Sequence, residues 1–175
     1  MQYSSTEKHD AELIVQLYKN TFTDSAGTAE GKAIAELVEQ LLAEDSVTGF
    51  VAAQGKALQG AIIFSALAFT DGTRGLLLSP VAVRTESQNQ GIGRQLINHG
   101  LSQLKLRGHD IVFTYGDPTY YSRFGFVVVS EDRVAAPYPL SMPEGWQGLS
   151  LQGADVMQFE GSVQCAAPFM DAKLW

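Results

Sequence analysis

A strand, a glycine-containing loop and a helix follow one another in residues 79–96 and have the layout of a phosphate site. The run reads Ser-Pro-Val-Ala-Val-Arg-Thr-Glu-Ser-Gln-Asn-Gln-Gly-Ile-Gly-Arg-Gln-Leu. The first amides of a helix lack partners within it and lie at the positive end of its dipole, so they attract phosphates. Gly91 and Gly93 have no Cβ, which lets a ligand approach the backbone, and Arg94 adds a positive charge. Residues 88–94 are therefore predicted to bind a pyrophosphate.

Single positions argue against two other glycine-rich phosphate sites. A dinucleotide fingerprint requires a third glycine at position 96, where this chain has Leu96. A P-loop requires Gly-Lys followed by Ser or Thr, but Ala33 and Ala57 follow the two Gly-Lys pairs. The remaining alternative to a phosphate site is a turn or a close packing point.

Other reactive groups give no support for a metal site or a covalent route. Cys165 is the single cysteine and cannot form an internal disulfide, so we interpret it as a packing residue. His9, His99 and His109 lack the spacing of metal ligands, and the chain has no Gly-x-Ser-x-Gly nucleophile elbow. We expect no metal and no protein nucleophile.

Two apolar patterns of helical period open the chain, in residues 7–22 and 33–42, with a loop expected at residues 23–27. Ser4 and Glu7 have the form of a capping box for the first helix. Three strands are expected at residues 47–53, 57–69 and 75–83, followed by a helix at about 92–107 and a strand at 110–114. A strand, a crossover helix and a strand form a parallel pair, so we expect a mixed sheet. After residue 129 we expect a long loop with three prolines, and then a strand at about residues 156–166.

The composition is that of a globular protein with a net charge of −7, which argues against a nucleic-acid partner. Residues 81–125 nevertheless hold five Lys and Arg against three Asp and Glu, a local excess that can attract a small anion. The first residues lack the features of a secretory signal, and no apolar run is long enough to span a bilayer. We expect a cytoplasmic protein without a membrane partner.

Two motifs resemble those of the GNAT N-acetyltransferase superfamily. Val81-x-Val83 followed by Gln88-x-x-Gly91-x-Gly93 resembles its acyl-CoA-binding motif, which has Arg or Gln before two glycines. Residues 116–126, Gly-Asp-Pro-Thr-Tyr-Tyr-Ser-Arg-Phe-Gly-Phe, resemble its late segment, which has Tyr shortly before Gly-Phe. The order of expected elements in residues 7–126 is also similar to that family. Residues 130–175 match it less clearly.

The resemblance implies an α/β (α+β) fold in one domain over residues 1–175, with the motif core at about 75–129. A mostly antiparallel central sheet would be flanked by helices, and a parallel strand pair would splay apart to bind acyl-CoA. The pair would end near Val83 and Tyr115 and hold the pantetheine arm. The cofactor-binding residues that it implies are Val81, Ala82, Val83, Gln88, Asn89, Gln90, Gly91, Ile92, Gly93, Arg94, Tyr120 and Tyr121.

The implied reaction is transfer of an acetyl group from acetyl-CoA, as co-substrate, to a primary amine. The backbone amide of Val81 would stabilise the oxyanion, and Tyr121 would donate a proton to the departing thiolate. Tyr120 would line the pocket. Without the upstream motif, both tyrosines would be interpreted as packing beside Phe124 and Phe126. Asp117 is expected to fix the turn with the following proline, and Arg123 is either a phosphate contact or an exposed cation.

The base that deprotonates the amine is missing from its usual place. Many relatives have Glu on the strand before the loop, but residues 75–81 contain no carboxylate. Candidates for this base are Glu30, Asp71, Glu160 or a water molecule. The alternative is that the three carboxylates are solvated side chains with no part in the reaction.

The acceptor is expected to be a small molecule or a peptide, and the protein a monomer or homodimer. Two other functions stay open. A non-catalytic sensor or regulatory module would bind acyl-CoA without turnover, and a structural interaction domain would bind no cofactor.

Overall fold

Strands β3 (Ala57–Phe69) and β4 (Arg74–Val83) and helix α3 (Ile92–Leu106) form the middle of the chain, close to the predicted bounds. The computed structural model describes residues 1–175 in two units. Met1–Phe64 and Pro80–Gly100 make the first unit, and Ser65–Ser79 and Leu101–Trp175 make the second. β3, β4 and α3 therefore contribute residues to both.

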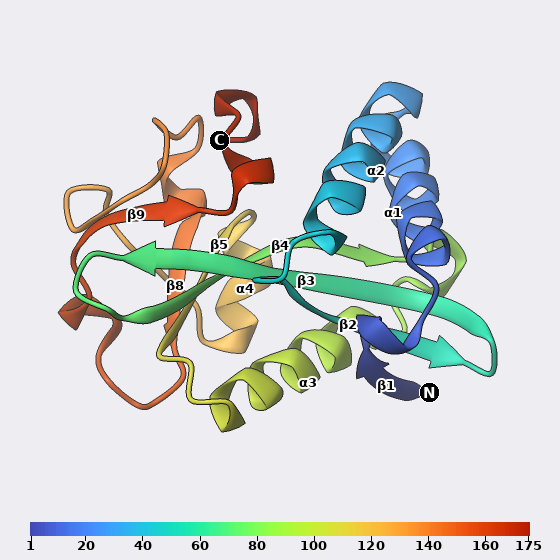
Figure 1. Cartoon of the computed structure of the whole chain (residues 1–175), viewed down its shortest axis with the longest axis horizontal. Helices are drawn as coiled ribbons and strands as arrows, with labels where there is room; N and C mark the ends of the chain where they lie inside the picture. The colour runs from blue at the N-terminus through green and yellow to red at the C-terminus, as the bar shows by residue number, and fades with distance from the viewer. The chain divides into compact units, whose positions relative to one another are not determined.

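Two antiparallel helices, α1 (Ala11–Ala26) and α2 (Thr28–Leu42), lie side by side in the first unit (Figure 1). The predicted capping box at Ser4 is wrong, because Ser4 lies in strand β1 (Gln2–Ser5). The cap of α1 is Asp10, whose side chain accepts the Glu12 N–H at 2.9 Å. The loop expected at residues 23–27 is also wrong. α1 continues to Ala26, and Gly27 alone, at φ 94°, separates the helices.

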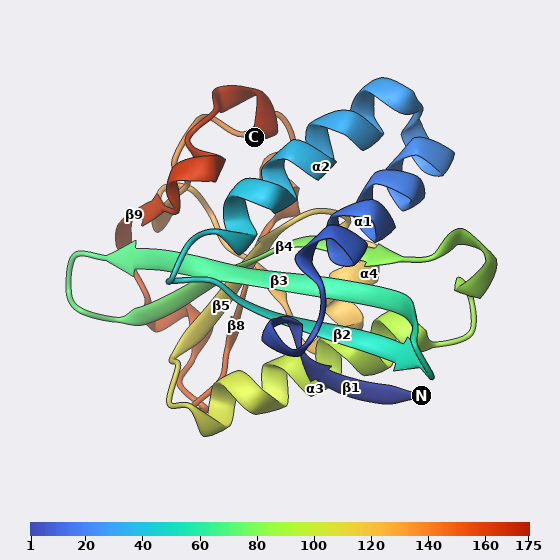
Figure 2. The same ribbon diagram turned by 45° about the vertical axis from the view of Figure 1, so that its right-hand side comes forward.

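The strands of the first unit pair antiparallel in the order β1, β2 (Thr48–Gln54), β3. Figure 2 shows these three strands as neighbours. Gly60 of β3 faces Leu96 of α3, and Ile62 and Phe64 face Gly100 of the same helix. Because side chains alternate along a strand, the odd-numbered neighbours point to the opposite face, where α1 and α2 lie (Figure 1). Residues 61–64 are fully buried, as expected of a strand covered on both faces.

The second unit contains the predicted parallel pair. Its part of β4 pairs with β5 (Ile111–Tyr115) in the register Gly75↔Ile111 to Leu78↔Thr114. β5 also pairs antiparallel with β8 (Trp146–Ser150), which pairs with β6 (Val127–Val128). The end of β3 pairs antiparallel with β9 (Gly161–Cys165), which is parallel to the two-residue β7 (Val134–Ala135). The prediction of a mixed, mostly antiparallel sheet flanked by helices is confirmed.

The segment after residue 129 is more ordered than predicted. It holds β8, a strand that the sequence did not predict, and β9, which lies within the predicted range 156–166. The short helices of the chain are η1 (Thr6–Lys8), η2 (Thr85–Ser87), α4 (Pro118–Tyr121), η3 (Ser122–Phe124), η4 (Pro143–Gly145), η5 (Val156–Gln158), η6 (Ala167–Phe169) and η7 (Ala172–Leu174). No helix combines the length and the apolar character that crossing a membrane requires.

Aromatic residues build the core of the second unit. The ring centroids of Phe113 and Trp146 are 4.6 Å apart, and both side chains are fully buried. Trp175 packs against Trp146 and Tyr115, with centroids 5.9 Å apart in both pairs. Both indoles find acceptors: Trp146 Nε1 donates to Val134 O and Trp175 Nε1 to Phe169 O, each at 3.0 Å.

Helices α1 and α2 are in close contact at Gly31. A Cβ at this position would lie 2.7 Å from Lys19 O and 2.9 Å from Thr23 N, and would also collide with Thr23 Oγ1. Two of these atoms belong to the backbone of α1, so they cannot move aside as a side chain would. The distance between the helices therefore depends on the absence of a side chain here.

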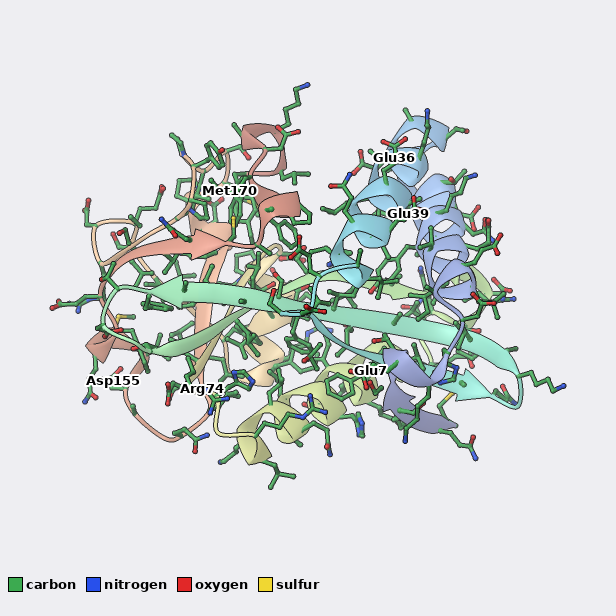
Figure 3. All side chains as sticks on the ribbon, viewed as in Figure 1. Glu7, Glu36, Glu39, Arg74, Asp155 and Met170 are labelled. Atoms are coloured by element: carbon green, nitrogen blue, oxygen red, sulfur yellow. The ribbon has the colours of Figure 1, made fainter.

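Gly31→Ala is expected to lower the free energy of unfolding by about 1–3 kcal/mol, because the methyl group overpacks this crossing. The better helix propensity of alanine offsets only about 1 kcal/mol. Urea unfolding measures the difference. Glu39→Ala is the control: Glu39 projects from the exposed side of the same helix (Figure 3), and its removal should change stability by less than about 0.5 kcal/mol. Wild-type stability in Gly31→Ala would show that the helices do not cross at this distance.

Candidate functional site

The loop between β4 and α3 is anchored to β3 by one residue, Gln59. The Arg84 N–H donates to Gln59 O at 2.9 Å, and the buried Ser87 hydroxyl donates to Gln59 Oε1 at 2.7 Å. Both the main chain and the side chain of Gln59 thus fix the start of the loop. Arg84 itself pairs with Glu86 at 3.1 Å.

Helix α1 supports the same segment from another side. Tyr18, Thr21 and Asp24 lie three residues apart and share one face of the helix. The Tyr18 hydroxyl donates to Pro80 O at 3.0 Å, and the Thr21 hydroxyl donates to Val83 O at 3.5 Å. Asp24 Oδ2 accepts the hydroxyl of Thr85 at 2.6 Å. The end of β4 and the start of the loop are therefore fixed by side chains of α1.

The start of α3 presents amides that the helix does not use. The Gln95 N–H donates to Gly91 O at 3.0 Å, so the amides of Ile92, Gly93 and Arg94 precede the first bond of the helix. Two positive φ angles, 59° at Asn89 and 79° at Gly91, turn the chain into this position. A Cβ at Gly91 would have one neighbour within 4 Å, the side-chain nitrogen Nε2 of Gln95 at 3.7 Å. The surface around Gly91 is therefore open. These features fit an anionic group such as a pyrophosphate.

The other predicted residues of this site differ in what their side chains do. Gln88 Nε2 donates to Val83 O at 3.0 Å and Gln90 Nε2 donates to Glu86 O at 3.2 Å, so both amides hold the loop together. Arg94 is exposed on the first turn of α3. Val81 and Val83 are half-buried, and Ala82 is buried with its carbonyl against Gly60. The first unit thus holds Val81–Val83 and residues 88–94 together on one strand, loop and helix.

The predicted tyrosines belong to the second unit, on α4. Asp117 caps this helix by accepting the Thr119 N–H at 2.8 Å, which agrees with the turn role expected for it. The Tyr121 ring packs on Gly116, where a Cβ would lie 2.8 Å from Tyr121 Cε2. Edge-to-face contacts join Tyr121 to Tyr120 and to Phe126, with centroids 5.2 Å and 5.7 Å apart. Both tyrosines thus pack against neighbouring rings, and this packing fixes the orientation of the Tyr121 ring.

The environment keeps the Tyr121 phenol protonated. Burial raises its pKa above the ordinary value of 10.0, a hydrogen bond with Thr114 opposes this, and Tyr120 adds to the rise. The Thr114 hydroxyl donates its own proton to Leu78 O at 3.0 Å, which leaves it poorly placed to stabilise a phenolate. A phenol with a raised pKa carries its proton at neutral pH, and it is a weaker acid than a solvent-exposed tyrosine.

The candidate carboxylates lie in different settings. Glu30 is exposed in the first turn of α2, and Glu160 is exposed beside Ser130 and Arg133. Asp71 accepts the Thr73 N–H at 2.9 Å, and hydrogen bonds from Thr73 lower its pKa. A carboxylate with a lowered pKa is a weaker base, which argues against Asp71 as the base.

His99, Cys165 and Arg123 were also considered in the sequence, and their surroundings in the structure indicate no catalytic role. His99 stacks on Tyr3 with centroids 5.5 Å apart, and burial lowers its pKa. Burial raises the pKa of the Cys165 thiol, which lowers its reactivity. Arg123 is exposed. No group of three or more His, Cys, Asp or Glu side chains is arranged to hold a metal ion.

A groove of about 390 Å³ in the first unit lies on a different surface from the α3 amides. It is lined by α1, by the turn between β2 and β3, and by residues 84–86. None of residues 88–94 lines it. The open amides are thus a surface feature outside this groove.

Sequence reasoning missed Tyr18, Thr21 and Gln59. Their partners at Pro80, Val83 and Ser87 are far away in the sequence; Tyr18 and Pro80 are 62 residues apart. One signal was present: a polar face on α1 at a spacing of three residues.

Similar proteins were found by sequence and by structure. Residues 43–128 match the family described as the acetyltransferase (GNAT) domain. An uncharacterized N-acetyltransferase of Escherichia coli strain K12, YjhQ, is 34% identical over 171 residues, covering 93% of this chain and 91% of that relative. The crystal structure of YhbS, a GNAT family N-acetyltransferase of Escherichia coli in complex with CoA, has a TM-score of 0.83 at 28% identity. The alignment covers 96% of this chain and 91% of YhbS.

A second solved structure of comparable identity is a GNAT family acetyltransferase of Brucella melitensis in complex with acetyl-CoA. Its TM-score is 0.74 at 28% identity, and the alignment covers 96% of this chain and 97% of that protein. At this coverage the similarity includes most of residues 130–175, which the sequence motifs did not reach.

The raised pKa of Tyr121 predicts a pH dependence of stability. A group whose pKa is higher in the folded state stabilises the fold fully below its unfolded pKa, and this contribution is lost as pH rises through the folded pKa. The free energy of unfolding of the wild type should therefore fall more steeply above about pH 10 than that of Tyr121→Phe. Urea unfolding between pH 8.5 and 11 measures both slopes. Phe124→Leu is the control, because it alters the same cluster without removing a phenol, and it should keep the wild-type slope. Equal slopes in wild type and Tyr121→Phe would contradict the raised pKa.

Proposed function

Because the chain belongs to the GNAT acetyltransferase family, we propose that it transfers an acetyl group from acetyl-CoA to a primary amine. The amine attacks directly in a ternary complex, without a protein nucleophile. The observation that carries the proposal is the open first turn of α3, where three amides lack helical acceptors beside Gly91. The CoA and acetyl-CoA complexes of YhbS and of the Brucella melitensis protein support the choice of co-substrate.

In this proposal, backbone groups make most of the contacts with acetyl-CoA. Residues 88–94 receive the pyrophosphate, with the amides at the start of α3 as donors and Arg94 as a cation. The main chain of Val81, Ala82 and Val83 holds the pantetheine arm, and Tyr120 lines the pocket. Gln88 and Gln90 act indirectly, because their side chains hold the loop in shape.

The reaction forms one bond and breaks another. The amine nitrogen bonds to the thioester carbonyl carbon, and the Val81 N–H stabilises the oxyanion of the tetrahedral intermediate. The carbon–sulfur bond then breaks, and the Tyr121 phenol gives its proton to the departing thiolate. The incoming ammonium loses one proton before it attacks, through Glu30, Glu160 or a water molecule, since the lowered pKa of Asp71 makes it a poor acceptor. The nitrogen loses its second proton when the intermediate collapses, and this proton restores the Tyr121 phenol.

The acceptor is a small molecule or a peptide that presents a primary amine. The elements assigned to shape its pocket are α1, α2 and the segment after residue 129. The protein acts as a monomer or a homodimer.

Release of the CoA thiol tests the activity. Purified protein is incubated with acetyl-CoA and a panel of polyamines, amino acids, aminoglycosides and peptides with free amino termini, and thiol is detected with a chromogenic disulfide. Amine-dependent release supports the enzyme. Tight binding of acetyl-CoA with no release from any amine would instead support the sensor, and no binding at all would support a structural domain.

Gly91→Val should weaken CoA binding about tenfold or more, a loss of about 1.4 kcal/mol or greater. The branched side chain occupies the open surface over the α3 amides and strains a residue at φ 79°. Isothermal titration calorimetry measures the affinity. Gly55→Val is the matched control, because Gly55 has φ 60° in the same unit and open space around it, but lies in the β2–β3 turn. Wild-type affinity in Gly91→Val would show that the pyrophosphate binds elsewhere.

Tyr121→Phe should lower kcat about 100-fold while the dissociation constant of acetyl-CoA changes little, as expected for loss of a general acid. Steady-state thiol release with the best amine of the panel, together with calorimetry, separates the two quantities. Tyr3→Phe removes the phenol of a residue in β1, to which the proposed reaction gives no role, and should keep the wild-type kcat. Normal turnover in Tyr121→Phe would exclude this residue from the mechanism.

A further inference from the structure

The peptide group between Pro80 and Val81 is held by a buried tyrosine. Tyr18 lies in the middle of α1, is 0% exposed, and donates its hydroxyl to Pro80 O at 3.0 Å. Pro80 has no N–H, so this residue offers its neighbours an acceptor only. The bond from Tyr18 therefore adds a side-chain donor to this strand carbonyl and helps to fix its direction.

The direction of the Pro80 carbonyl also fixes the direction of the Val81 amide. A peptide group is planar, and in its trans form the C=O and the following N–H point in opposite directions. A donor bound to the carbonyl thus locks the N–H on the other side. It also polarises the group, since hydrogen bonds in a chain strengthen one another.

A second peptide group of β4 provides a comparison. The Val83 carbonyl accepts Gln88 Nε2 at 3.0 Å, and the N–H of the same group, that of Arg84, donates to Gln59 O at 2.9 Å. Both ends of that group are used to hold the loop. The Tyr18 bond instead acts on the group whose N–H belongs to Val81.

We propose that Tyr18 is a positioning residue for the acetyl transfer, which orients and polarises the Val81 N–H as the donor to the thioester carbonyl. The inference rests on the proposed function, because it assigns Tyr18 a task only if the Val81 amide meets that carbonyl. Tyr18 itself touches neither acetyl-CoA nor the amine.

Infrared difference spectroscopy reports the polarisation directly and needs no acceptor. Acetyl-CoA with a ¹³C-labelled thioester carbonyl is bound at saturation, and its C=O stretch is compared with that of free acetyl-CoA. The wild type should shift the stretch to lower wavenumber, and Tyr18→Phe should lose at least half of that shift with similar affinity for acetyl-CoA. Tyr3→Phe is the matched control. It removes another tyrosine hydroxyl bond of the first unit, from Tyr3 to Gln95 Oε1 at 2.9 Å, and should keep the full shift.

A fluorinated tyrosine at position 18 tests the same bond without removing it. The more acidic phenol of 3-fluorotyrosine is a stronger donor, so the carbonyl stretch should shift further than in the wild type. This arm also remains informative if Tyr18→Phe folds poorly.

The outcomes separate the two levels of the proposal. A wild-type shift that is unchanged in Tyr18→Phe and in the fluorotyrosine protein would overturn the role of Tyr18 and leave the proposed function standing. Bound acetyl-CoA with no shift in the wild type would remove the Val81 oxyanion donor, and the role of Tyr18 with it.

Discussion

The first amides of a helix have no acceptor within that helix. In the first unit the amides at the start of α3 have no helical acceptor, and hydrogen bonds fix the loop that precedes them. Gln59 binds the loop through both its main chain and its side chain, and Gln88 and Gln90 bond back to residues 83 and 86. The side chains of Ser87, Gln88 and Gln90 thereby have partners within the protein. The charge on the helix end can then act on an anion without the loop first becoming ordered, which is the usual benefit of preorganisation.

The parts of the fold that the sequence predicted are those with an unambiguous period. β2, β3, β4 and α3 have regular apolar spacing and clear turn residues, and their bounds are correct within a few positions. The spacing of Ser4 to Glu7 is that of a helix cap, but pairing of β1 with β2 places Ser4 in the sheet. β8 was missed because Trp146, Gln147 and Gly148 are all buried, so the strand shows no alternation.

The candidate site also contains features that the sequence predicts and features that only the fold reveals. Gly91 and the amides of α3 could be predicted, because the signal is a run of adjacent residues with a definite backbone requirement. The setting of Tyr121 could not, since the contact with Gly116 and the buried Thr114 depend on the turn that α4 makes. The support from α1 was also beyond sequence reasoning. A hydroxyl such as that of Tyr18 reveals its partner only when the helix is docked.

The first unit is assembled from two stretches of chain, because residues 65–79 leave it for the second unit before the chain returns at Pro80. During synthesis, the α1–α2 hairpin has only local contacts and can form early. The end of β4, which the polar face of α1 binds, emerges from the ribosome later, after residues 65–79. Until then the Pro80 carbonyl that accepts the Tyr18 hydroxyl is not yet available to it. Docking of the polar face of α1 onto residues 80–85, rather than helix formation, is thus the later step in assembling the first unit.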